Sequence, residues 1–109
     1  MKIAVAQINP TVGDVGGNVA RMLRLVEKAA RAGAALIVFP ELGVIGYPPR
    51  DLLFRPEVIT RVQDVLQRQI LPASLRTGIL VGAPVRDPAR ERLYNAALLF
   101  YGGRLVGRQ

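Results

Sequence analysis

Two short apolar runs, with a stretch of helical periodicity between them, dominate the first forty residues. The runs at 2–8 and 34–39 are rich in Ile, Val and Ala. Their lack of strict alternation predicts strands buried on both faces. From Val19 to Ala30 apolar residues recur every three or four positions, which predicts a helix with one buried face. Strand, helix and strand together predict a βαβ unit.

The boundaries of this first helix are predicted from its flanking residues. Gly13, Gly16 and Gly17 indicate a loop before the helix. Asn18 is the predicted N-cap, because a side-chain oxygen at that position can accept a hydrogen bond from a free backbone N–H. Gly33 is the predicted end of the helix.

A second predicted helix and a third predicted strand follow. A second helix is predicted from Pro56, since proline at the first helical position loses no hydrogen bond. Its apolar positions lie on one face between residues 58 and 70, and Pro72 is predicted to end or bend it. Residues 79–83 predict a third, buried strand.

The remaining residues predict two further strands joined by a hairpin. Residues 93–101 predict a fourth strand and a fifth begins at Arg104. Gly102-Gly103 between them is typical of a two-residue hairpin turn. The order β-α-β-α-β-β-β therefore predicts an α/β fold with a mixed sheet. No helix is predicted to cover the opposite face, so we expect either another subunit on that face or a chain that is part of a longer domain.

Composition narrows the class of protein. The 109 residues, half of them apolar, are enough for one packed domain. The absence of Cys excludes disulfides and thiolate metal sites, and the absence of His removes the commonest metal ligand. With no signal pattern and no membrane-length apolar stretch, we predict a cytoplasmic protein that does not contact a membrane.

The net charge of +7 does not by itself indicate a nucleic-acid partner. Nucleic-acid-binding proteins concentrate basic residues on one stripe and add aromatic residues for stacking. Here the basic residues are mostly scattered arginines, and aromatic residues make up only 6% of the chain. We therefore predict a solvated basic surface and no nucleic-acid partner.

Glu41 is the main candidate for chemistry. It follows a predicted buried strand in "VFPE", and functional groups of α/β sheets gather beyond the carboxyl ends of strands. Pro40 restricts the preceding residue to an extended conformation. A glutamate in this place is a candidate general base, although carboxylates after strands are also commonly structural or solvated. Asp14 is predicted to cap a turn, and no metal site is predicted.

Four segments carry a resemblance to a known family. The chain resembles the carbon–nitrogen hydrolase (nitrilase) superfamily and, more closely, is similar to the glutaminase domains of glutamine-dependent NAD+ synthetases. The segments are "KIAVAQINPTVGDVGGN" at 2–18, "LIVFPELGVIGYPPRDLL" at 36–53, "ILVGAP" at 79–84 and "RLYNAALLFYGGRLVG" at 92–107. The "FPE" motif is typical of the superfamily, whereas "GYPPRDLL" points to the synthetase branch.

The resemblance implies a Glu-Lys-Cys triad in which Glu41 takes the thiol proton of the cysteine. It also implies an α-β-β-α sandwich, of which residues 1–109 would be the N-terminal part. The family's lysine and cysteine have no counterpart here, because the only lysines, Lys2 and Lys28, lie elsewhere. We therefore expect a fragment that is inactive by itself. Tyr47 is a candidate contact for glutamine by analogy, and Asn95 is expected to satisfy a buried backbone group.

The resemblance further implies the reaction of the parent protein. Glutamine would be hydrolysed, and a synthetase domain absent from this chain would use the ammonia to amidate nicotinic acid adenine dinucleotide. ATP and Mg²⁺ are expected for that domain, whereas no cofactor is expected in this chain. A homo-oligomer is implied as well. The alternatives are another carbon–nitrogen hydrolase, such as an amidase or nitrilase, and a non-catalytic basic binding module.

Overall fold

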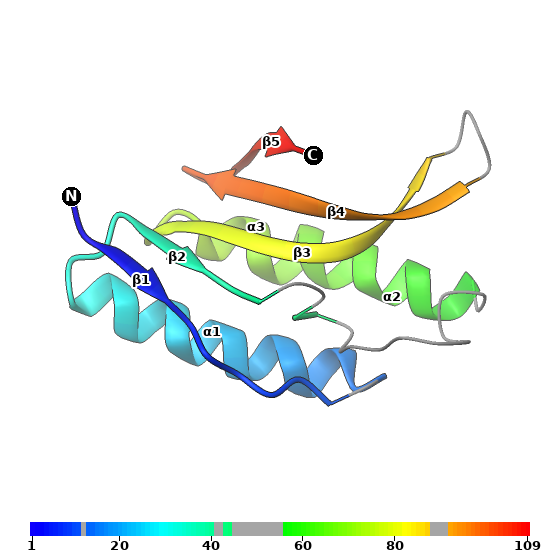
Figure 1. Ribbon diagram of the computed structural model, residues 1–109, viewed down its shortest axis with the longest axis horizontal. Helices are drawn as coiled ribbons and strands as arrows, with labels where there is room; N and C mark the ends of the chain where they lie inside the picture. Colours follow the sequence, from blue (N-terminus) through cyan, green and yellow to red (C-terminus); the bar gives the residue numbers. More distant parts are fainter. Residues whose placement is uncertain (12, 41–42, 45–55, 88–91) are drawn as a thin grey trace.

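A computed structural model describes residues 1–11, 13–40, 43–44, 56–87 and 92–109. The elements follow the predicted order, with a break in the second helix. They are β1 (Ile3–Val5), α1 (Val15–Arg31), β2 (Leu36–Val38), α2 (Pro56–Val65), η2 (Leu66–Ile70), α3 (Leu71–Ala73), β3 (Gly78–Asp87), β4 (Arg92–Tyr101) and β5 (Arg104–Arg108). Figure 1 shows the long helices α1 and α2 beside one twisted sheet.

The five strands form one mixed sheet in the order β1-β2-β3-β4-β5. The first three strands are parallel, with Ile37 of β2 opposite Ala4 of β1 and Ile79 of β3. β4 and β5 are antiparallel to their neighbours. The predicted α/β class and mixed sheet are thus confirmed. Parallel pairing requires a crossover between strands, and α1 and the α2-to-α3 segment lie in the two crossovers.

The start of α1 differs from the prediction. The helix begins at Val15, so Gly16 and Gly17 belong to its first turn and are not part of a loop. Asp14 is the N-cap, and its Oδ1 accepts a hydrogen bond from the backbone N–H of Gly17 at 3.0 Å. Asn18 lies inside the helix, so its assignment as N-cap was wrong. An aspartate four residues earlier already satisfies a free N–H of the first turn.

The end of α1 and the last hairpin agree with the predictions. Gly33 has a φ of 80°, a left-handed conformation that favours glycine, and it follows the C-cap of α1. Gly102 and Gly103 have φ angles of 63° and 79°. Positive φ at both central residues is the requirement of a type I′ hairpin turn, which joins β4 to β5.

Of the two outcomes expected at Pro72, an end or a bend of the helix, the structure shows a change of helical pitch beside the proline and no immediate end. The helical segment passes through the π-turn η2 and continues to Ala73, one residue beyond the proline. In η2 the backbone N–H of Leu71 donates to the carbonyl of Leu66, five residues earlier. Proline has no N–H to donate to the preceding turn, and such local changes of helical pitch commonly occur beside it.

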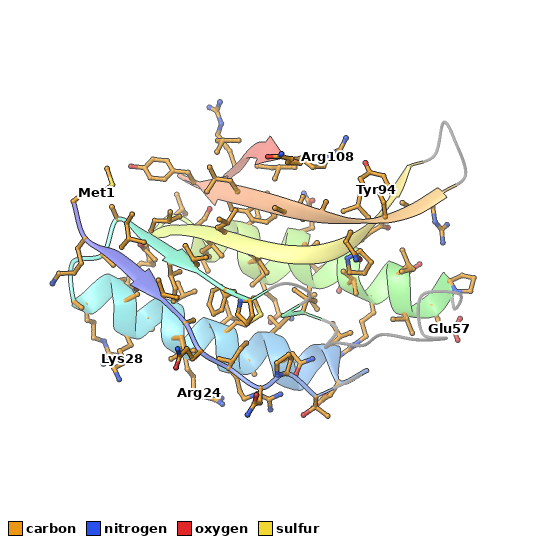
Figure 2. The ribbon with its side chains drawn as sticks, viewed as in Figure 1. Met1, Arg24, Lys28, Glu57, Tyr94 and Arg108 are labelled. Carbon is orange, nitrogen blue, oxygen red and sulfur yellow. The ribbon has the colours of Figure 1, made fainter. Side chains whose placement is uncertain are left out.

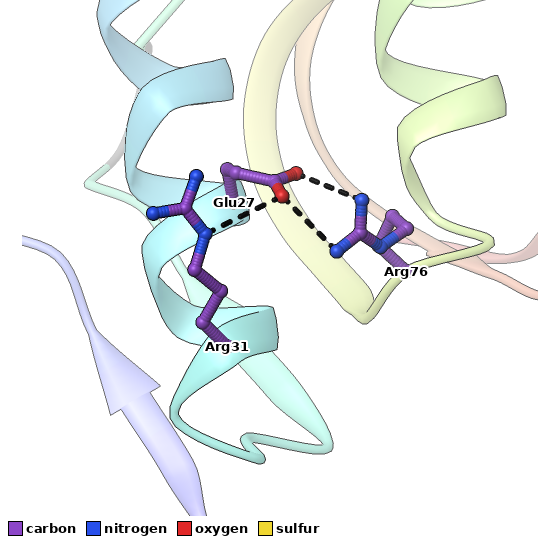
Figure 3. Close-up of polar contacts among 3 residues, drawn as sticks. All are labelled: Glu27, Arg31 and Arg76. Carbon is purple, nitrogen blue, oxygen red and sulfur yellow. Dashed lines mark hydrogen bonds and ion pairs between the residues drawn. The ribbon is translucent and has the colours of Figure 1, made fainter.

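Two ion pairs share Glu27, and one of them connects α1 to the turn before β3. The guanidinium of Arg76 approaches both carboxylate oxygens of Glu27 at 3.0 Å, and Arg31 Nε lies 3.6 Å from the same carboxylate (Figure 3). Two parallel contacts give Arg76 a defined geometry. Because both arginine side chains are well exposed to water and Glu27 is partly exposed, we expect the ion pairs to contribute at most about 1 kcal/mol.

The hydrophobic core lies on one face of the sheet. It joins α1, the second helical segment and alternate residues of β2, β3 and β4. Its buried members include Met22, Val62, Ile70, Ile79 and Val81. The opposite face carries apolar side chains that are exposed: Ile3, Val5 and Tyr101 are 53%, 74% and 60% exposed. Among the described residues, the face that was predicted to lack cover is therefore exposed.

We expect the 109-residue chain by itself to self-associate through this open face, because exposed apolar patches favour association. Val5→Lys should lower the association, since a charge on that face must be desolvated in the contact. Gln69→Lys, at an exposed position of the π-turn, adds the same charge elsewhere and is the control. Sedimentation velocity at increasing concentration measures the effect. A wild-type chain that stays monomeric would contradict the prediction.

Candidate active site

The two candidate site residues, Glu41 and Tyr47, lie outside the described residues. Their predicted roles therefore stay predictions. The structure does describe the chain on both sides of Glu41: Phe39 and Pro40, which follow β2, and Gly43 and Val44. These four residues form the frame of the candidate site.

Backbone hydrogen bonds fix the first part of this frame. The N–H of Phe39 donates to the carbonyl of Leu80 at 2.9 Å, which extends the pairing of β2 with β3 by one residue. The N–H of Gly43 donates to the carbonyl of Pro40 at 3.1 Å. Phe39 is 5% exposed and Val44 is fully buried in the core. The frame is thus anchored by burial as well as by hydrogen bonds.

Asn18 anchors the second part of the frame. Its side-chain Nδ2 donates to the carbonyl of Val44 at 3.0 Å and to that of Thr11 at 2.8 Å. Its Oδ1 accepts from the N–H of Thr11 at 2.7 Å. Sequence reasoning missed this role. The signal was an amide on the apolar face of a helix, in helical register with the buried Val15 and Met22.

A hollow of about 280 Å³ lies beside the frame on the sheet. Its lining is mostly apolar, with one amide side chain: Phe39, Leu80, Val81, Gly82, Asn95, Ala96 and Ala97. Asn95 is exposed, and its side chain makes no hydrogen bond to another described residue. The alternation of side chains along β4 points Asn95 to the open face, so no buried backbone group of the described residues is satisfied by it, contrary to the expectation.

Neither lysine lies at the carboxyl ends of the parallel strands. Lys2 precedes β1, and its Nζ donates to the carbonyl of Ala32 at 2.6 Å. Lys28 projects from α1 away from the sheet (Figure 2). Within the described ranges no three His, Cys, Asp or Glu side chains are grouped as a metal site. The helices of the same part of the chain are all too short or too polar to cross a membrane.

The fold and the position of the frame define a class of protein. The described sheet is mixed, its helices lie on one face, and the frame follows the parallel strand β2. The chain belongs to the carbon–nitrogen hydrolase family, which it matches over residues 2–109.

Two relatives in sequence are named as the same kind of enzyme. The chain is 36% identical over 106 residues to the glutamine-dependent NAD(+) synthetase of Acinetobacter baylyi, covering 97% of this chain and 19% of that protein. It is 34% identical over 108 residues to the enzyme of the same name from Thermotoga maritima, covering 98% and 18%. The chain therefore spans about a fifth of the length of these curated relatives.

Solved structures agree with this placement. The glutamine-dependent NAD+ synthetase of Acinetobacter baumannii, in complex with ADP, matches with a TM-score of 0.89 and 30% identity over 98% of this chain and 20% of that chain. An amidase from Nesterenkonia sp. matches with a TM-score of 0.82 and 21% identity, over 99% and 41%. The second likeness concerns the fold alone.

Proposed function

We propose that this chain is the N-terminal part of a glutamine amidohydrolase domain of an NAD+ synthetase. The observation that carries the proposal is the 36% identity, over nearly the whole chain, to a protein named for glutamine-dependent NAD+ synthesis. The "GYPPRDLL" motif and the frame around position 41 are consistent with it. The full-length synthetase would be longer than these 109 residues, as the relatives are.

In this proposal Glu41 is the general base. Its carboxylate takes the proton of a cysteine thiol, and the thiolate attacks the side-chain amide carbon of glutamine. A C–S bond forms, the C–N bond breaks, and ammonia leaves with the proton that Glu41 returns. Water then hydrolyses the thioester to glutamate. A lysine would stabilise the oxyanion of each tetrahedral intermediate.

The lysine and cysteine of this mechanism would come from the rest of the full-length synthetase. Lys2 and Lys28 are held elsewhere, and the sequence has no cysteine. The 109-residue chain alone would therefore not hydrolyse glutamine. Tyr47, six residues after Glu41, would contact the glutamine substrate.

The rest of the proposal concerns the synthetase domain and the assembly. ATP and Mg²⁺ would bind the synthetase domain, where ammonia amidates nicotinic acid adenine dinucleotide. This chain itself would hold no cofactor. The full-length synthetase would work in the cytoplasm as a homo-oligomer, with neither nucleic acid nor a membrane as a partner.

The full-length synthetase tests this function with glutamine labelled with ¹⁵N in its side-chain amide. We expect the label to appear in the carboxamide of the dinucleotide product when ATP and Mg²⁺ are present. Unlabelled ammonium at high concentration should dilute the label, since both sources feed the same amidation. Hydrolysis of glutamine without any labelled dinucleotide would instead indicate an amidase. No reaction with glutamine would contradict the proposal.

A further inference from the structure

Asn18 holds together three segments that are far apart in the sequence. It lies on α1, is completely buried, and bonds Thr11 in the loop after β1 and Val44 in the frame of the candidate site. The bond to Val44 spans 26 residues of sequence. A buried amide has to be hydrogen-bonded, but its partners need not belong to a site. Here one partner lies three residues from Glu41.

The partners of Asn18 determine which way its amide faces. Two donors meet Oδ1: the backbone N–H of Thr11 at 2.7 Å and the guanidinium of Arg21 at 2.5 Å. Nδ2 donates to two carbonyl oxygens, those of Thr11 and Val44. A flipped amide would place donor against donor and acceptor against acceptor. The charged Arg21 strengthens its bond and so favours the observed orientation.

Three contacts therefore hold the chain on both sides of position 41. Before it, Phe39 is bound to β3 through Leu80. After it, Gly43 is bound to Pro40 and Val44 to Asn18. Of these, the bond to Val44 is the only one made by a side chain, so a substitution can remove it without changing the backbone.

We propose that Asn18 is a positioning residue for Glu41. Asn18 acts by holding the Val44 carbonyl, and with it the part of the frame that follows position 41. This inference rests on the proposed function, because it assumes that Glu41 is the base. Asn18 itself touches neither substrate nor thiol in this proposal. Misplacement of a catalytic group by about 1 Å can lower a rate by about 100-fold.

Asn18→Asp in the full-length synthetase tests the proposal. Aspartate has the same shape and keeps an acceptor toward Thr11 N–H and Arg21, but it places an oxygen against the carbonyls of Thr11 and Val44. We expect glutamine-dependent kcat to fall about 10- to 100-fold, with ammonia-dependent synthesis and the KM for glutamine within about twofold.

Thr77→Val is the matched control. Thr77 is also buried and donates to a backbone carbonyl across segments, from its Oγ1 to Ala34 at 2.6 Å. Its bond lies at the other end of β2, away from the frame. We expect this variant to keep both the glutamine-dependent and the ammonia-dependent rate. An equal fall of the glutamine-dependent rate in both variants would overturn the proposal.

A second variant covers the case in which Asn18→Asp does not fold. A Cβ added at Gly43 would lie 3.2 Å from the carbonyl oxygen of Pro40, so Gly43→Ala displaces the same frame without changing Asn18. We expect it to lower glutamine-dependent kcat as well. If Gly43→Ala and every folded Asn18 variant keep the wild-type rate, the proposal is wrong.

A double variant separates positioning from a general structural role. If Asn18 acts through Glu41, then Asn18→Asp should change the residual glutamine-dependent rate of Glu41→Gln by less than about twofold. Additive losses would overturn the proposal. Failure of the proposed function would look different, because Glu41→Gln alone would then keep its use of glutamine.

Discussion

Glu41→Gln in the full-length synthetase should abolish glutamine-dependent synthesis and leave ammonia-dependent synthesis intact. Glutamine has nearly the same shape as glutamate but cannot take the thiol proton, so the nucleophile stays protonated. Loss of a general base lowers a rate by about 10²- to 10⁴-fold. Ammonia added from solution bypasses this step. Steady-state rates of dinucleotide amidation with each nitrogen source measure the difference.

Two further variants make this result specific. Glu41→Asp keeps the carboxylate one methylene further back, and we expect a glutamine-dependent rate between those of wild type and Glu41→Gln. Glu57→Gln removes a carboxylate from the first turn of α2, on the surface of the protein (Figure 2). This control should keep both rates. Loss of both rates in Glu41→Gln would indicate a structural role for Glu41.

Ile79→Ala should lower the free energy of unfolding of the 109-residue chain by about 2–5 kcal/mol, the range for large-to-small changes in a core. Ile79 is fully buried in β3, the middle strand of the sheet, and belongs to the core shared with the helices. Such a loss is a large share of the stability of a small domain. Urea unfolding of dilute protein measures it.

Ile3→Ala is the control for this prediction. It makes the same chemical change in β1, but the side chain is 53% exposed on the open face of the sheet. Little apolar surface is returned to water, so we expect a change within about 0.5 kcal/mol. Similar losses for the two variants would show that the core does not lie on the helical face alone.

Much of the fold could be predicted from local signals. The start of α2 at Pro56, the end of α1 before Gly33 and the hairpin at Gly102-Gly103 all depend on backbone geometry that one or two residues determine. The period of the apolar positions predicted the helices and strands just as directly, because it shows which side of an element is apolar. These features therefore matched the structure closely.

The errors occurred where several local signals compete. Asp14 and Asn18 are both good N-caps, and the glycines between them suggested a loop that extends to Asn18. In the structure Asp14 caps the helix, and Asn18 is thereby placed on its buried face. The exposure of Asn95 was missed for a related reason: an apolar strand does not reveal which of its faces is covered.

The sequence by itself determined the order of elements, the α/β class and the place of Glu41 after a strand, since these depend on neighbouring residues and on the period of apolar positions. Only the tertiary structure decided that both helices share one face of the sheet, and that Asn18 reaches Val44. Contacts across 26 residues depend on how packed elements meet, which no local pattern encodes.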